Sequence, residues 1–75
     1  MMGIPMQDVQ GIWMVAGSRN AIRPSMEAAL RAAHELWTKG ERIIAVLRVG
    51  SDDRLEASAI IAAWRELDLP TPATI

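Results

Sequence analysis

Two short apolar runs constrain the fold of this chain more than any other feature of its sequence. One covers residues 11–16 and the other residues 42–49, and each is followed by a Gly-Ser pair. Neither run alternates apolar and polar residues in its centre, and β-branched residues are frequent in both. This pattern is typical of strands that are buried on both faces of a sheet.

A helix is predicted between the two strands, over residues 26–39. Its apolar residues recur at i, i+3, i+4 and i+7, which places them on one side of the helix. Ser25 is the expected N-cap, and Gly40 follows the last turn, where glycine commonly ends a helix. The segment between the first strand and this helix, residues 18–24, is polar and is interpreted as a loop.

A second helix is expected after the second strand. Asp53 and Glu56 have the spacing of a capping box, so the helix should begin after Asp53 and end near Leu67. Apolar residues cover most of its circumference, which is typical of a helix buried on more than one side.

The resulting element order, β-α-β-α, indicates a small two-layer α/β domain. Two strands joined by a crossover helix should be parallel, and right-handed crossovers would place both helices over one face of the sheet. The other face would then need a cover that this chain does not supply, so we expect oligomerisation to complete the fold. The domain should span residues 11–69, between a leader at 1–10 and an extended tail at 70–75.

Composition excludes several ways of stabilising so short a chain. The 75 residues include no cysteine and one histidine, so we expect no disulfide, no metal site and no cofactor. A chain of this size buries only about 60% of its unfolded surface, which leaves good packing or association as the remaining means. The hydrophobic content of 51% fits both.

Charge and hydropathy limit the classes of partner that the chain is expected to bind. The net charge of −1 argues against nucleic-acid binding, and no apolar run approaches the roughly 20 residues that span a bilayer. A chain without cysteine is compatible with a reducing compartment, so we expect a cytoplasmic protein. The expected partner is a second copy or another protein, met through large apolar groups in the first strand and the second helix: Trp13, Ile60, Ile61 and Trp64.

The loop after the first strand offers a second hypothesis. Gly17, Ser18 and Arg19 follow a strand and precede a helix, and Arg23 adds charge, so the loop could bind an anion. Over these few residues it resembles Rossmann-like nucleotide-binding domains, although the spacing of the glycine motif is absent. The alternative is that the arginines pair with Asp52 and Asp53, which a parallel sheet would place at the same end.

Nothing in the sequence indicates an enzyme. His34 lies at the edge of the first helix's apolar side, with no nucleophile or carboxylate placed to act with it. The sequence therefore predicts a non-enzymatic interaction or regulatory protein that self-associates or serves as a subunit of a complex. The alternative is a small-anion or nucleotide-binding module that uses the loop at residues 17–19.

Overall fold

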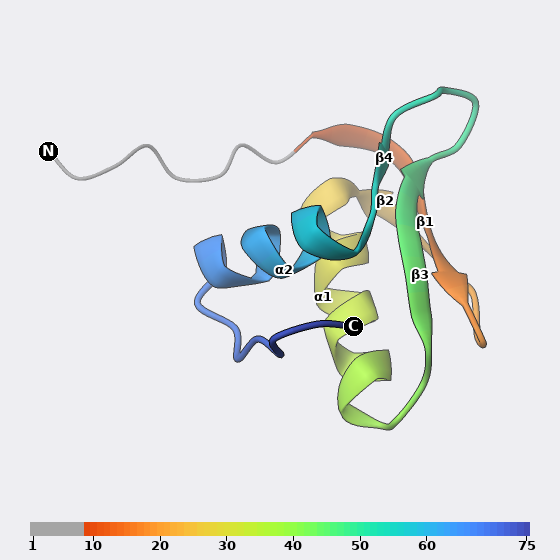
Figure 1. Ribbon diagram of the computed structural model, residues 1–75. Helices are drawn as coiled ribbons and strands as arrows, with labels where there is room; N and C mark the ends of the chain where they lie inside the picture. Colours follow the sequence, from red (N-terminus) through yellow and green to blue (C-terminus); the bar gives the residue numbers. More distant parts are fainter. Residues whose placement is uncertain (1–8) are drawn as a thin grey trace, which may run out of the picture.

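A computed structural model describes residues 9–75 as one four-stranded sheet with two helices. Figure 1 shows both helices on the same side of the sheet, so the molecule has two layers. The strands lie in the order β2-β1-β3-β4. In chain order the elements are β1 (Gln10–Gly17), β2 (Ala21–Ser25), α1 (Met26–Thr38), β3 (Ile43–Arg48), β4 (Arg54–Leu55) and α2 (Ala57–Glu66).

The predicted parallel strand pair is wrong, because every pairing in the sheet is antiparallel. The two predicted strands do form, as β1 and β3, and they are neighbours. Between them, however, β2 reverses the chain before α1 begins, so α1 connects β2 to β3 and not β1 to β3. The domain is therefore α+β and not the predicted α/β class.

Strand β2 lies in the segment that was predicted to be a loop. It contains Arg23 and Pro24, and proline is normally excluded from central strands. Here β2 is an edge strand, where only one side of the backbone needs partners, and β1 supplies them from Trp13 to Val15. Pairing along an edge, rather than the residues' own preferences, therefore makes this segment a strand.

The first helix confirms its predicted signals at both ends. The Ser25 hydroxyl accepts a hydrogen bond from the Ala28 N–H at 3.2 Å, as an N-cap does. At the other end Gly40 has a φ of 86°, and its N–H donates to the Trp37 carbonyl at 2.9 Å. Glu41 donates to the Leu36 carbonyl at 3.0 Å, which completes a Schellman motif.

The second helix begins later than predicted, at Ala57. Residues 54–55 form β4 instead, paired with β3, so the predicted capping box at Asp53 is wrong. Glu56 occupies the N-cap position and makes no side-chain capping bond. The helix ends in a second Schellman motif, in which Asp68 has a φ of 63° and Leu69 donates to the Trp64 carbonyl at 2.9 Å.

The core lies between the helices and the facing side of the sheet. Trp64 is fully buried there, and its indole N–H donates to the Leu30 carbonyl at 2.9 Å. The predicted tail at 70–75 carries no helix or strand, and Ile75 packs against the core. The predicted leader at 1–10 lies mostly outside the described residues. The largest fully buried side chains are Trp64, Leu30, Ile60, Val15 and Val46.

Candidate functional site

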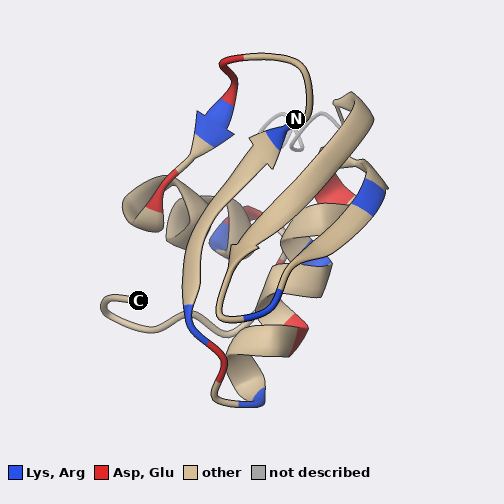
Figure 2. Ribbon diagram, turned by 90° about the vertical axis from the view of Figure 1, so that its right-hand side faces the viewer, with Lys and Arg blue, Asp and Glu red and all other residues tan. Residues whose placement is uncertain are grey.

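One face of the sheet is covered by the helices, and the described residues leave the other face uncovered (Figures 1 and 2). Side chains alternate along a strand, and directly paired residues share a face. Trp13 and Val15 face the helices, so Ile12, Met14 and Ala16 point the other way. The pairing register adds side chains from β2 and β3, and Val49 donates its N–H to the Ile12 carbonyl. We call this set the open face: Ile12, Met14, Ala16, Ile22, Ala45, Leu47 and Val49.

The open face is apolar and partly accessible, with Ala45 fully buried beneath its neighbours. The exposed fractions of Ile12, Ile22 and Val49 are 51%, 61% and 50%. Met14 and Leu47 are half-buried between them. An antiparallel sheet with one solvated face normally alternates apolar and polar residues, and this sheet does not. The outward side chains therefore lack the polar residues that normally line a solvated sheet face.

Charges lie only at the margin of this face. Strand β1 carries no charged residue, and none of the β2 and β3 residues that the pairing register places on this face is charged; the first charge on it comes from β4. There Arg54 lies opposite Leu47, and its Nε is 3.1 Å from a carboxylate oxygen of Glu56. The nearby Arg48 is 3.6 Å from the Asp53 carboxylate. Both arginines thus have acidic partners within the chain, and the open face offers no strong charge to a ligand.

The two edges of the sheet are poorly suited to adding a further strand. At β2, Pro24 lacks an N–H, and the Arg23 guanidinium donates to the Ile22 carbonyl at 2.8 Å. At the other edge β4 has only two residues. Proline, charged side chains and short edge strands are common devices against edge-to-edge pairing. The open face, and not an edge, is the part of the sheet that is available for association.

The four predicted interface residues lie inside the folded chain. Ile60 and Trp64 are fully buried, Trp13 is 3% exposed and Ile61 is 9% exposed. The indole N–H of Trp13 is buried with no hydrogen-bond partner among the described residues. These side chains therefore leave almost no surface for a second chain to touch while the domain is folded.

The predicted anion loop already binds a carboxylate of the same chain. Ser18 Oγ donates to Glu41 Oε1 at 2.7 Å, and Arg19 Nε donates to Glu41 Oε2 at 3.1 Å. The Arg42 N–H in turn donates to Ser18 Oγ at 2.8 Å. The hydrogen bond from Ser18, followed by the bond and charge of Arg19, lowers the pKa of Glu41. An added anion would have to displace this carboxylate.

Sequence reasoning missed Glu41 because its interactions depend on the sheet direction. In the antiparallel sheet the loop at residues 17–19 lies beside the start of β3, whereas Asp52 and Asp53 follow its far end. The alternative pairing of Arg19 with those aspartates is therefore not formed. A helix N-terminus does not follow the loop directly either, since β2 intervenes.

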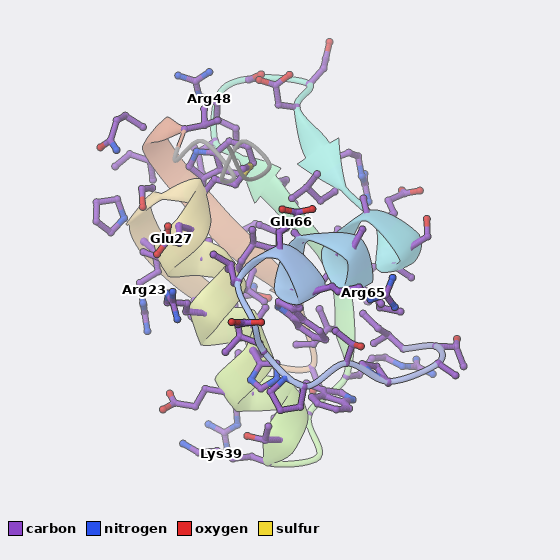
Figure 3. All side chains as sticks on the ribbon, turned by 90° about the vertical axis from the view of Figure 1, so that its left-hand side faces the viewer. Arg23, Glu27, Lys39, Arg48, Arg65 and Glu66 are labelled. Carbon is purple, nitrogen blue, oxygen red and sulfur yellow. The ribbon has the colours of Figure 1, made fainter. Side chains whose placement is uncertain are left out.

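The fourth predicted anion-binding residue, Arg23, donates instead to the Ile22 carbonyl and lies on the side of α1 that faces away from α2 (Figure 3). A shallow groove of about 670 Å³ between β2 and α1 has both Arg19 and Arg23 in its wall. The groove also contains Glu35, whose carboxylate opposes an incoming anion, and apolar side chains from both elements. Its lining residues are Arg19, Asn20, Ala21, Ile22, Arg23, Ala32, Glu35 and Leu36.

The contacts of His34 indicate that it stabilises the fold. Its Nε2 lies 2.8 Å from the Pro70 carbonyl oxygen, and its ring meets the Trp64 ring edge-on at 5.0 Å. It thereby fastens the chain after α2 to α1. Within residues 9–75, no three His, Asp or Glu side chains gather in a way that could hold a metal ion.

The sequence led us to expect an uncovered sheet face, but not the residues that form it. Ile12 and Met14 alternate with Trp13 and Val15, and the unbroken apolar run was interpreted as a parallel strand covered on both sides. The helices of the described region are all too short or too polar to cross a bilayer. Comparisons of the chain with protein-family models, curated protein sequences and solved structures gave no match. The geometry of the open face therefore carries the functional argument.

Proposed function

We propose that this protein is a non-enzymatic interaction protein that acts through the open face of its sheet, by self-association or as a subunit of a complex. One observation carries the proposal: the sheet is antiparallel, yet its second face is apolar, no described helix covers it, and Ile12, Ile22 and Val49 on it are half exposed or more. Contiguous apolar patches of this kind commonly mark interaction surfaces. We also propose that the protein is cytoplasmic, because a chain without cysteine is compatible with a reducing compartment.

The geometry favours an interaction surface over the anion-binding alternative. The carboxylate of Glu41 already satisfies Ser18 and Arg19, so the loop has no vacant donors directed at one point. The open face has the opposite property, because its exposed isoleucines have no neighbour to bury them. Burial of apolar area is the dominant favourable contribution to most protein association.

Site-specific photo-crosslinking in cells that express the protein tests this proposal. A benzophenone side chain at Ile22 should give crosslinked protein adducts, and the same group at Ala62 should give few, because Ala62 is exposed on the helical layer. Adding Ile12→Glu should reduce the Ile22 adducts, since it places a charge on the open face. Equal adduct yields from the two positions would show that the open face is not a preferred surface.

A further inference from the structure

We infer that the occupant of the open face is a second copy of this chain, packed face to face to give a four-layer dimer of helices, sheet, sheet and helices. This inference rests on the proposed function and names its partner. Three properties of the described residues lead to it: the charge of the open face, the state of the sheet edges and the area of the face.

The absence of charge at the centre of the open face is compatible with binding a second copy of the same face. A two-fold interface brings the same surface from both chains together, so any charge at its centre would lie beside a charge of the same sign. The open face has none: its centre is Met14, Ala16 and Leu47. Arg54, at the margin, already has Glu56 beside it. Like-charge repulsion is therefore absent where the two copies would meet.

The edges of the sheet favour a closed dimer over an open polymer. Strand pairing from chain to chain could continue indefinitely, and Pro24, Arg23 and the short β4 oppose it. Two sheets that pack face to face lie about 10 Å apart with their strands about 30° from parallel, and the contact is complete with two copies. The twisted, uncharged open face fits this second geometry.

The area of the open face indicates how strong a dimer it could form. Four short strands at a spacing of about 4.8 Å, with about 3.3 Å per residue, give a face on the order of 350 Å² per copy in flat projection. Specific stable interfaces bury about 800 Å² per partner, so this one lies at the small end even after allowance for side-chain relief. An interface of this size belongs to the weak, transient class, so we expect a reversible dimer with a Kd of roughly 10 μM or more.

Sedimentation equilibrium of the full chain, over total concentrations from about 1 μM to about 1 mM, tests the inference. The average mass should rise from the 8.2 kDa of one chain towards twice that value. The double variant Ile12→Glu, Ile22→Glu should stay at the monomer mass throughout and keep its thermal midpoint, because both side chains are already half exposed or more. The matched control Ala62→Glu adds a charge to the helical layer and should dimerise like the parent chain.

Several results would overturn the inference. One is a monomer mass for the parent chain at the highest concentration. Another is loss of the dimer in Ala62→Glu but not in the open-face variant. If removal of residues 1–8 turns a monomer into a dimer, the chain's own N-terminal segment occupies the face. A monomer whose Ile22 photo-crosslinks persist would refute the second copy and leave the proposed function standing, whereas loss of both would refute the two together.

Discussion

Trp13 and Trp64 are both buried tryptophans, yet the structure predicts that replacing them with phenylalanine has different consequences. Trp64 donates its indole N–H to the Leu30 carbonyl at 2.9 Å. The indole N–H of Trp13 is buried without a partner among the described residues. Phenylalanine keeps an aromatic ring at each position and removes the N–H. Comparing the two variants therefore measures how much the indole N–H contributes to stability at each position.

The magnitudes follow from the two environments. At Trp64 the change removes a buried hydrogen bond, which contributes about 1 kcal/mol, and part of a large ring, whose lost burial costs roughly 1 kcal/mol more. We therefore expect Trp64→Phe to lower the free energy of unfolding by about 2 kcal/mol. Trp13→Phe loses similar burial, but it also removes an unsatisfied donor whose desolvation costs about 1–3 kcal/mol. Its net effect should lie between zero and a gain of about 2 kcal/mol.

Urea unfolding followed by far-UV circular dichroism measures both differences. The protein should be kept at about 5 μM, below the expected Kd, because dimerisation would otherwise add to the apparent stability. In thermal scans the midpoint of Trp13→Phe should exceed that of Trp64→Phe by at least about 8 °C, from roughly 4–8 °C per kcal/mol for a domain of this size. Equal losses at the two positions, or a larger loss for Trp13→Phe, would refute the reasoning from hydrogen-bond satisfaction.

Three further predictions concern the helix ends and the loop carboxylate. Asp68 has a left-handed φ of 63°, so Asp68→Gly should raise the free energy of unfolding by up to about 1 kcal/mol in urea melts. Ser25→Ala removes the cap bond to the Ala28 N–H and should cost about 1 kcal/mol in the same assay, whereas Ser25→Asp should retain most of the stability. Folding lowers the pKa of Glu41 from its ordinary value of 4.5, so its contribution is present above that value and is lost as the pH falls through the folded pKa. Stability measured from neutral to acidic pH should therefore fall less steeply below 4.5 in Glu41→Gln than in the parent chain.

Local signals in the sequence correctly predicted the elements that are determined by interactions within the element itself. The hydroxyl of Ser25 and the backbone freedom of Gly40 mark the two ends of α1, and both were predicted. The apolar centres of β1 and β3 were also predicted. In each case the determining interaction lies within a few residues of the signal.

Strand direction could not be predicted in the same way. It depended on β2, which contains Arg23 and Pro24 and becomes a strand only because β1 pairs with one of its sides. Likewise β4 forms where a capping pattern at Asp53 predicted helix, since pairing with β3 outweighs a cap of about 1 kcal/mol. Both errors arise from pairing with the strand that precedes the segment, which no signal inside the segment itself indicates.

The residues that the sequence favoured as an interface are not those that form the open face. The expectation that two helices would cover one face and leave the other uncovered agrees with Figure 1, although the sheet direction behind it was wrong. Large size and helical position made Ile60 and Trp64 attractive as interface residues, and the chain uses both for its own core. The outward residues Ile12 and Ile22 belong to two different strands, so only the pairing register reveals that they share a surface.

A dilution series followed by amide chemical shifts tests the central claim most directly. Between about 1 mM and about 10 μM protein, the amides of the open face should shift progressively, because that range spans the expected Kd. The largest changes should fall on Ile12, Met14, Ile22 and Leu47, and the outward positions of α1 and α2 should stay constant. Shifts that cluster on the helices, or a spectrum that does not change with concentration, would contradict association through the open face.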